Sequence, residues 1–256
     1  MYAEERQQAI ADRVRADGRA AVADLAVEFD VTSETVRRDL AVLERAGHVQ
    51  RVHGGAVRAG AIAVIGEQGI DVRETSNTEQ KAAIGRAAVR FLPPSGGSVF
   101  FDAGTTTYQA ALNLPTDRRL TLITNSIPIA GVLAGYDDAD LHVLGGRVRG
   151  LTQATVGADT VAALDGLRVT TAFVGANGIS EHHGLSTPDP DEAAIKRAMV
   201  RSADRVVVLA DSSKMGREDL AGFAGLDDVD VIITDAGIDP RTSAVFSARG
   251  IEMVIA

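Results

Sequence analysis

The chain has 256 residues, which is long enough for one large domain or for two ordinary ones. Its composition is 45% hydrophobic and 24% charged, which is typical of a globular protein and excludes a disordered or collagen-like chain. It contains no cysteine, so disulfide scaffolds, iron–sulfur clusters, cysteine zinc sites and thiol nucleophiles are excluded. The sequence shows neither an apolar run of about 20 residues nor a signal-peptide pattern at its start, so we expect a cytoplasmic protein with no membrane partner.

The net charge of −9 is distributed unevenly along the chain. Residues 1–60 contain nine arginines and ten acidic residues, a net charge of −1, whereas residues 61–256 carry −8. Within residues 31–60, five arginines face three acidic residues, a local balance of +2. Because phosphate contacts dominate the affinity of proteins for nucleic acids, this short basic stretch is the candidate DNA-binding region.

The first 57 residues have the pattern of a small helical domain followed by a hairpin. Apolar residues recur at spacings of three and four from Ile10 to Leu43, which predicts three short amphipathic helices. The second and third are joined by a tight turn in which Thr32 is placed to cap the third helix, so the pair forms a helix-turn-helix. After Gly47 the apolar residues alternate around Gly54 and Gly55, which predicts a hairpin or wing.

The third predicted helix has a polar face suited to the major groove of DNA. Its apolar residues Val36, Leu40 and Leu43 are expected to face the core, and arginine and hydroxyl side chains occupy the opposite side. Arginine pairs bidentately with guanine, and hydroxyls contact phosphates or base edges. An isolated pair of arginines is more often a solvated helix face, but the preceding turn and the following hairpin favour DNA binding. The candidate DNA-binding residues are Thr32, Ser33, Thr35, Arg37, Arg38, Arg51, His53 and Gly54.

The remainder of the chain has a different pattern. Residues 59–76 are expected to form a linker, and the polar stretch from Asp71 to Asn77 is expected to be poor in helix. A predicted helix over Thr78 to Phe91 is followed by strands that alternate with helices, the pattern of an α/β fold with a parallel, helix-covered sheet. The predicted strands span residues 98–101, 120–124, 141–144, 172–175, 205–210, 229–234 and 252–255. The expected domains are therefore residues 1–58, which bind DNA, and residues 77–256, which form the α/β domain.

Small polar loops follow several of these strands. Asp102 ends one strand and is followed by Gly104 and three threonines at the start of a helix, where backbone N–H groups favour phosphate. A single such turn is more often an ordinary capped turn, but similar loops follow three further strands, at residues 124–126, 145–147 and 175–178. Since ligands of open parallel sheets sit at the carboxyl ends of strands, these loops predict one pocket.

Lysine is rare in this chain, with three residues against 23 arginines. Lys214 follows a strand and is the preferred partner for a phosphate, because a compact ammonium and a guanidinium are not interchangeable. Lys81 and Lys196 lie on predicted helices, where a surface ion pair is at least as good an explanation as a binding role. Glu192 lies one turn before Lys196 and is placed to pair with it.

The residues of the first domain carry a family resemblance. Residues 1–57, above all the run Thr-Val-Arg-Arg-Asp-Leu from Thr35 to Leu40 and the His-Gly-Gly-Ala of residues 53–56, resemble the winged helix-turn-helix of DeoR-family transcriptional regulators. The sequence departs from the family pattern at Ala21, where Ser or Thr usually caps the second helix, and at Asp30, where Gly is usual in the turn. These departures concern local stability.

The resemblance continues from about residue 73 to residue 235, which looks like the DeoR-family sensor domain. It implies a fold similar to ribose-5-phosphate isomerase and coenzyme A transferases, and a phosphorylated sugar or polyol as effector. Ala103 departs from the serine that is common after the motif's aspartate. The candidate effector-binding residues are Asp102, Gly104, Thr105, Thr106, Thr107, Asn125, Ser126, Gly146, Arg147, Gly178, Glu192 and Lys214.

The resemblance therefore implies a transcriptional regulator, expected to be a repressor of carbohydrate uptake or catabolism genes. It would bind operator double-stranded DNA as a homo-oligomer, a dimer or a tetramer, and respond to a phosphorylated sugar. The overall pattern looks most like members associated with fructose or phosphotransferase sugar uptake, which makes fructose 1-phosphate the first guess. We expect no catalytic residue and no cofactor. We also expect no metal site, because His182 and His183 are adjacent and no close carboxylate cluster completes one.

Two alternatives remain open at this point. In the first alternative the chain is an enzyme, a sugar-phosphate isomerase or transferase with a DNA-binding head, in which Asp102 with Lys214 or Glu192 transfers protons. Alternatively it is a DNA-binding structural protein with an inert second domain. Turnover of sugar phosphates and ligand-induced thermal shifts discriminate among the three.

Overall fold

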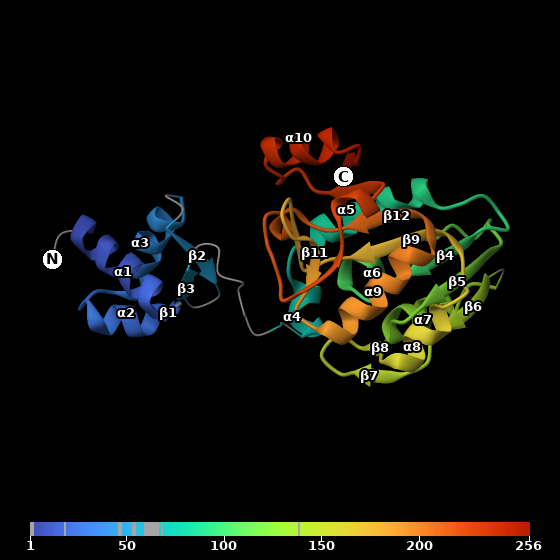
Figure 1. Ribbon diagram of the computed structural model, residues 1–256, viewed down its shortest axis with the longest axis horizontal. Helices are drawn as coiled ribbons and strands as arrows, with labels where there is room; N and C mark the ends of the chain where they lie inside the picture. The colour runs from blue at the N-terminus through green and yellow to red at the C-terminus, as the bar shows by residue number, and fades with distance from the viewer. Residues whose placement is uncertain are drawn as a thin grey trace. The chain divides into compact units, whose positions relative to one another are not determined.

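The computed structural model (Figure 1) describes residues 3–17, 19–45, 48–52, 55–58, 67, 69–137 and 139–256. The chain divides into two compact units, residues 1–65 and residues 66–256. Among the described helices none is both long and apolar enough to cross a membrane.

The first unit is a winged helix-turn-helix. Its elements are α1 (Ala3–Asp17), β1 (Arg19–Ala21), α2 (Val22–Glu28), α3 (Ser33–Arg45), β2 (Val49–Val52) and β3 (Gly55–Arg58). The three strands form an antiparallel sheet in the order β1-β3-β2. The helices enclose a small aliphatic core that includes Ile10, Val14, Leu25, Val36 and Leu40. The three predicted helices and the hairpin are thus confirmed.

The two departures from the family pattern lie at the start of α2 and in the turn between α2 and α3. Thr32 Oγ1 accepts a hydrogen bond from the Thr35 backbone N–H at 3.2 Å, so the predicted cap of α3 is present. Asp30 has a φ of +49°, a left-handed conformation that Asp tolerates better than most residues although glycine takes it more easily. Ala21 begins α2 without a side-chain cap. The turn therefore keeps its geometry while α2 lacks one stabilising contact.

The second unit is an α/β domain built on a seven-stranded sheet. The strand order is β15-β14-β12-β9-β4-β5-β6, and all six neighbouring pairs are parallel. The strands are β4 (Ser98–Phe101), β5 (Leu120–Thr124), β6 (Ala139–Val143), β9 (Val169–Gly175), β12 (Ala203–Leu209), β14 (Val231–Thr234) and β15 (Glu252–Ile255). Each overlaps a strand expected from the sequence, so the α/β fold class is confirmed.

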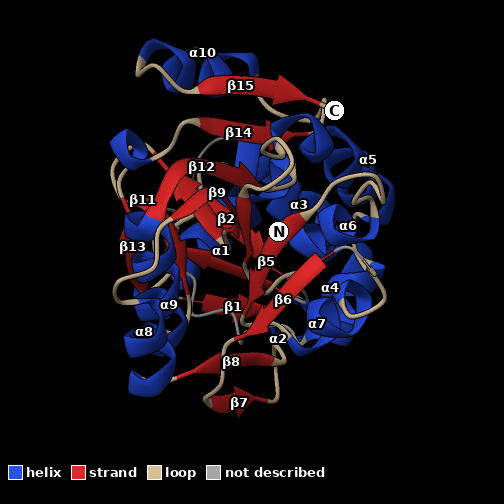
Figure 2. Ribbon diagram, turned by 90° about the vertical axis from the view of Figure 1, so that its right-hand side faces the viewer, coloured by secondary structure: helices blue, strands red, loops and turns tan. Residues whose placement is uncertain are grey.

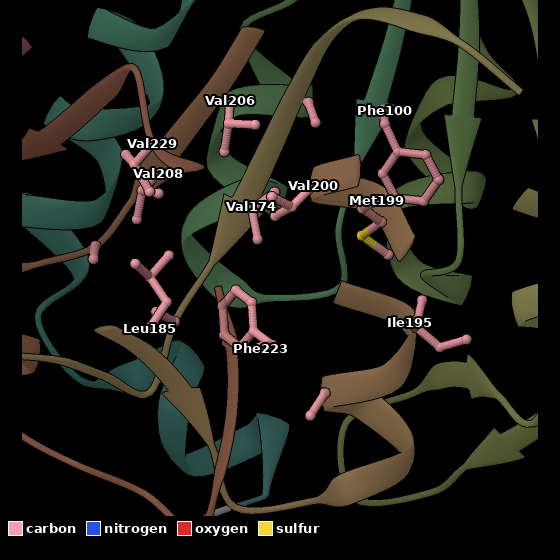
Figure 3. Close-up of a cluster of buried hydrophobic side chains, with 14 of the residues drawn as sticks. Phe100, Val174, Leu185, Ile195, Met199, Val200, Val206, Val208, Phe223 and Val229 are labelled. Atoms are coloured by element: carbon pink, nitrogen blue, oxygen red, sulfur yellow. The ribbon is translucent and has the colours of Figure 1, made fainter. Parts of the chain in front are cut away.

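Helices cover both faces of this sheet (Figure 2). One face packs against α5 (Thr78–Ala88), α6 (Thr105–Leu112) and α7 (Ile127–Leu133), through a core that includes Phe101 and Phe173, whose rings stack at 5.3 Å between centroids. The other face packs against α8 (Ala158–Leu164), α9 (Pro190–Ser202) and α10 (Pro240–Ala248). Figure 3 shows this second core, in which Met199 of α9 lies close to Phe100 of β4. Two-sided burial explains why strands such as β4 and β14 are almost entirely apolar.

Short antiparallel strands lie outside the main sheet and were not expected from the sequence. They are β7 (Arg147–Arg149) paired with β8 (Ala154–Val156), and a second sheet of β10 (Gly178–Ser180), β11 (Gly184–Thr187) and β13 (Ala221–Ala224). Short 3-10 turns complete the unit at Val89–Phe91, Ser212–Lys214 and Leu226–Asp228. The expectation that the stretch from Asp71 to Asn77 is poor in helix is wrong, because Ile70–Thr75 forms α4, which belongs to the second unit.

Candidate functional site

The exposed face of α3 carries the candidate DNA-binding residues that the structure describes. Val36, Leu40 and Leu43 are buried. On the opposite side, the side chains of Arg37 and Arg38 are 59% and 79% exposed. Both approach Glu34 only loosely, at 3.8 and 3.7 Å, so their guanidinium groups are available to another partner. Thr32, Ser33 and Thr35 lie at the same end of the helix, where Thr32 is exposed and the other two are half-buried.

Asp39, in the middle of the predicted recognition helix, has a structural task. It is 4% exposed and accepts hydrogen bonds from Arg6 at 2.6 Å and Gln7 at 2.8 Å. These contacts tie α3 to α1, so the acidic residue fixes the orientation of the helix that bears Arg37 and Arg38. The sequence motif contained this residue, but the motif alone did not indicate its partners on α1.

The wing is described only in part. Arg51 lies on β2, in register with Ala56 of β3, but the placement of its side chain is not described. His53 and Gly54 lie outside the described residues. Gly55 is required at its position, because a Cβ there would lie 2.2 Å from the carbonyl oxygen of Ala20 on β1.

A cavity lies at the carboxyl ends of strands β4, β9 and β12 in the second unit. Backbone and side chains from α4, from the starts of α5, α6 and α9, and from the loops after the strands line it. The lining residues are Arg73, Ser76, Asn77, Lys81, Ala103, Gly104, Thr105, Thr106, Thr107, Gly175, Ala176, Asn177, Glu192, Lys196, Leu209, Ala210, Asp211 and Lys214. Six predicted effector residues are thus brought together: Gly104, Thr105, Thr106, Thr107, Glu192 and Lys214.

The loop before α6 presents a helix N-terminus to this cavity. Thr107 Oγ1 donates a hydrogen bond to the carbonyl oxygen of Gly104 at 2.9 Å, which closes the first turn. Asn125, in the loop after β5, accepts a hydrogen bond from the Ala103 N–H at 3.1 Å and donates one to Thr155. Asn125 is buried and does not line the cavity, so its contact is with the loop. The first N–H groups of α6 have no partner within the helix, and the residues that carry them line the cavity.

Three lysines and one arginine line the cavity: Lys81, Lys196, Lys214 and Arg73. Lys81 is buried, and its Nζ donates to the carbonyl oxygens of Arg73 and, at 2.6 Å, of Ser76. Burial lowers the pKa of Lys81 to about 8, and the nearby charges of Lys214 and Arg73 act in the same direction against Asp211. Burial also lowers the pKa of Lys214, again with help from neighbouring arginines. The surface ion pair considered for Lys81 is therefore wrong.

Lys196 makes a different contact from the one considered. Its Nζ donates to Asp102 and, at 3.0 Å, to the carbonyl oxygen of Gly175, and both side chains of the ion pair are at most 5% exposed. Asp102 also accepts from the Gly175 N–H at 2.9 Å. The pair joins β4, β9 and α9 beneath the cavity. Lys196 therefore makes neither a surface ion pair nor a pair with Glu192.

Glu192 instead belongs to a cluster around Arg149 of β7. It accepts a hydrogen bond from Thr152 and lies 3.1 Å from an Arg149 nitrogen. The same guanidinium pairs with Glu67 and, at 3.0 Å, with Asp189. Hydrogen bonding to Glu67 and the surrounding carboxylates raise the pKa of Arg149, while burial opposes this, so its charge is permanent. No local sequence pattern indicated this cluster, since its partners are 43 and 82 residues away.

Asp211 supplies a hydrogen-bond acceptor at the cavity that has no partner among the described residues. Its Oδ1 accepts from Asn77 at 3.0 Å and from the Ser213 N–H at 3.1 Å. Its Oδ2 is buried and makes no hydrogen bond with any described group. Because an unsatisfied buried acceptor is costly, a donor from a ligand is the natural partner for it.

The other predicted effector residues lie away from the cavity lining. Arg147 is 63% exposed and pairs with Asp191 at 2.6 Å, and Ser126 caps α7. Gly146 packs against Thr160, where a Cβ would lie 2.1 Å from the hydroxyl oxygen, and Gly178 packs against the backbone of Arg217. His182 and His183 are exposed between β10 and β11, and among the described side chains no group of three potential metal ligands occurs.

Comparisons with known protein families assign both units. Residues 6–60 match the DeoR-like helix-turn-helix domain, and residues 76–236 match the DeoR C terminal sensor domain. The chain belongs to the DeoR family. The family resemblance carried by the sequence motifs is thus confirmed.

Relatives of this DeoR-family chain match it along nearly its whole length. It is 36% identical over 255 residues to the HTH-type transcriptional regulator GlpR of Haloferax volcanii, covering 99% of this chain and 98% of the relative. It is 33% identical over 249 residues to the lactose phosphotransferase system repressor of Lactococcus lactis, covering 96% of each. These relatives are named as transcriptional regulators or repressors, one of them as the repressor of a lactose phosphotransferase system.

Among solved structures, the DeoR-family chain is similar to ribose 5-phosphate isomerase A of Methanocaldococcus jannaschii. The match has a TM-score of 0.42 and 19% identity and covers 56% of each chain. A probable sor operon regulator of Shigella flexneri matches with a TM-score of 0.41 and 12% identity, over 71% of this chain and 85% of that one.

Proposed function

We propose that this protein is a cytoplasmic repressor of carbohydrate uptake or catabolism genes and that a phosphorylated sugar controls its binding to operator DNA. The observation that carries the effector half is the cavity of the second unit. It combines a helix N-terminus, the cations Lys81 and Lys214, and the unpaired Oδ2 of Asp211. A phosphate satisfies the first two features and a sugar hydroxyl donates to the third.

In this proposal the phosphate rests on the first turn of α6, at Thr105 to Thr107, beside Lys214. The two lowered lysine pKa values support an anionic ligand, since a bound phosphate offsets the repulsion among buried positive charges. Asp211 and Glu192 lie among the lining residues and are suited to hydroxyl groups. Asn125 and Asp102 act by holding the loops beneath, and Arg147, Ser126, Gly146 and Gly178 are not assigned contacts with the ligand.

The DNA half rests on the exposed face of α3. Thr35, Arg37 and Arg38 contact the major groove, while Arg51 and His53 contact the backbone from the wing. A homo-oligomer, a dimer or a tetramer, presents paired first units to a repeated operator. The relatives named as repressors of sugar systems support this target.

The arrangement around Asp102 argues against the isomerase alternative. A carboxylate that acts as a general base must reach the proton that it removes from the substrate. Asp102 is 1% exposed, is paired with Lys196, accepts a backbone hydrogen bond and does not line the cavity. Glu192 is held by Arg149 and Thr152. The cavity is thus better suited to binding a sugar phosphate than to moving its protons.

A gel-shift titration tests the proposal. The full-length protein is mixed with its own upstream intergenic DNA and titrated with fructose 1-phosphate, fructose 6-phosphate, glycerol 3-phosphate and the free sugars. We expect one phosphorylated compound to alter DNA binding and its unphosphorylated form to leave it unchanged. DNA binding that no compound alters would reject the effector role, and turnover of a sugar phosphate would restore the enzyme alternative.

A further inference from the structure

α4 is the first helix of the second unit. The first unit ends at residue 65, and α4 begins at Ile70. None of its six residues is buried. We use the name α4 segment for residues 69–77. Because a helix without a buried face gains little from packing, the position of this segment depends on the polar contacts at its ends.

Those contacts lead to the cavity. The Ile70 N–H donates to the carbonyl oxygen of Leu151 at 2.9 Å, next to the Arg149 cluster. At the other end, Lys81 Nζ donates to the carbonyl oxygens of Arg73 and Ser76, and Asn77 donates to Asp211. Three residues of the segment, Arg73, Ser76 and Asn77, line the cavity. The segment is therefore a wall of the binding site and also the first helix of the second unit.

Arg73 is the charged side chain of this wall. It lines the cavity together with Lys81 and Lys214. Its positive charge lowers the pKa of both lysines, so the three cations repel one another. Among the described residues no carboxylate lies within ion-pair distance of the Arg73 guanidinium, although Asp211 and Asp219 lie in the same surroundings. A cavity wall that carries a guanidinium near two ammonium groups, without a described carboxylate at ion-pair distance from the guanidinium, is suited to an anion.

The Arg149 cluster anchors the chain just before the α4 segment. Arg149, whose side chain is 17% exposed, pairs at once with Glu67, Asp189 and Glu192. Glu192 lines the cavity, and Glu67 is the first described residue of the second unit. The Arg149 guanidinium therefore pairs both with Glu192, a carboxylate of the cavity wall, and with Glu67, at the start of the described part of the second unit. A ligand hydroxyl that bonds to Glu192 competes for the same oxygens as Arg149.

We propose that Arg73 is a further effector-binding residue, contacting the phosphate group, and that the α4 segment with the Glu67–Arg149–Glu192 contacts transmits effector binding to the DNA-binding unit. The proposal rests on the proposed function of the cavity. The effector acts by favouring the arrangement in which Arg73 reaches the anion and Glu67 keeps its anchor, because a ligand shifts an equilibrium only by its difference in affinity for the two states. Coupling is reciprocal, so operator DNA changes the affinity for the effector by the same factor.

The experiment uses the full-length protein with two readouts for each variant. Calorimetry gives the Kd of the four probes fructose 1-phosphate, fructose 6-phosphate, glycerol 3-phosphate and inorganic phosphate. Gel shifts on the upstream intergenic DNA give the ratio of operator affinities with and without the probe that binds most tightly. The variants are Arg73→Gln, Arg73→Lys and Glu67→Gln. Arg147→Gln is the matched control, because Arg147 lies on the same strand as Arg149 and makes an exposed ion pair.

The two parts of the proposal predict different outcomes. Arg73→Gln raises the Kd of every phosphate probe about tenfold or more, and Arg73→Lys recovers part of the loss because it keeps the charge. Glu67→Gln leaves the Kd within about threefold of the wild type but reduces the effect of the probe on operator affinity to less than about twofold, from a typical coupling of about 5- to 150-fold. Arg147→Gln changes neither readout.

A further readout separates transmission from a loss of folding. Amide hydrogen exchange in peptides covering residues 69–77 slows when the probe binds to the wild type, and it slows in Glu67→Gln as well, because this variant is folded and Arg73 still contacts the ligand. Wild-type Kd values in Arg73→Gln overturn the phosphate contact, and full operator control in Glu67→Gln overturns the transmission route. If no probe binds to the wild type, the proposed function fails before any variant is compared, and the inference fails with it.

Discussion

The two units of this chain place their positive charges in opposite surroundings. On α3 of the first unit, the side chains of Arg37 and Arg38 are 59% and 79% exposed. In the second unit, Lys81 and Lys196 are 6% and 4% exposed, and Lys214 lies in the wall of the cavity. An exposed arginine costs little folding free energy and remains accessible to a large polyanion. A buried ammonium group loses its hydration, which is costly unless a partner of opposite charge or a hydrogen-bond acceptor lies beside it. Lys196 has its partner within the protein, Asp102, whereas Lys214 and Arg73 make no ion pair among the described residues.

The largest expected effect comes from breaking the buried pair. Lys196→Met leaves the carboxylate of Asp102 buried without its counter-ion, which destabilises the second unit by about 3–5 kcal/mol. Urea denaturation followed by circular dichroism measures this loss. Arg168→Gln is the control, because Arg168 makes an exposed ion pair with Asp204 and its loss costs less than about 1 kcal/mol. Equal stabilities of the two variants would show that burial of the pair does not determine its contribution.

The next effect concerns the ligand and leaves folding intact. Lys214→Met removes a partly buried ammonium that has no ion pair among the described residues, so we expect stability to be unchanged or raised. The affinity for the phosphorylated effector falls by about 2 kcal/mol, the value of a hydrogen bond to a charged group. Calorimetry with the compound that alters operator binding measures the change. Unaltered affinity in Lys214→Met would remove this lysine from the phosphate site.

Substitution of an exposed arginine on α3 should weaken DNA binding and leave stability nearly unchanged. Arg38→Ala weakens specific operator binding by about 1–3 kcal/mol if the side chain reads a base, and the thermal stability stays within about 0.5 kcal/mol of the wild type. A gel-shift titration with specific and unrelated DNA measures both affinity and specificity. Arg13→Ala on α1, where the arginine side chain is 50% exposed, serves as the control. An unchanged titration for Arg38→Ala would exclude it from the recognition set.

The sequence predicted the elements whose signals are local. The apolar spacing of α3, the cap at Thr32 and the strands buried on both faces depend on neighbours within a few residues, and the structure contains them. Gly104 to Thr107 and Lys214 also follow directly from strand ends, and they meet in the cavity. Periodicity and turn chemistry are sufficient for such features.

Contacts between distant segments were beyond the reach of the sequence patterns. Lys81 and Lys196 were placed on helices, but a helix position does not by itself say which neighbouring element covers it. Arg147 and Arg149 are two residues apart on β7, and so point to the same side of an ideal strand, yet only Arg149 is enclosed by carboxylates. The α4 helix was missed because it has no buried stripe and hence no apolar period.

The smallest expected effect links the buried lysines to pH. The pKa of Lys81 is about 8 in the free protein, lowered by burial below its usual value, and a bound phosphate raises it again by favouring the charged form. Above pH 8 the effector must therefore bind together with a proton, so its Kd rises about threefold between pH 7.5 and 8.5. Calorimetry in two buffers of different ionisation enthalpy measures the proton uptake. Lys81→Arg keeps the charge at this position throughout the range, so it removes the contribution of Lys81 to the pH dependence and leaves that of Lys214, whose pKa burial also lowers. Equal pH profiles in the wild type and in Lys81→Arg would show that Lys81 does not sense the ligand's charge.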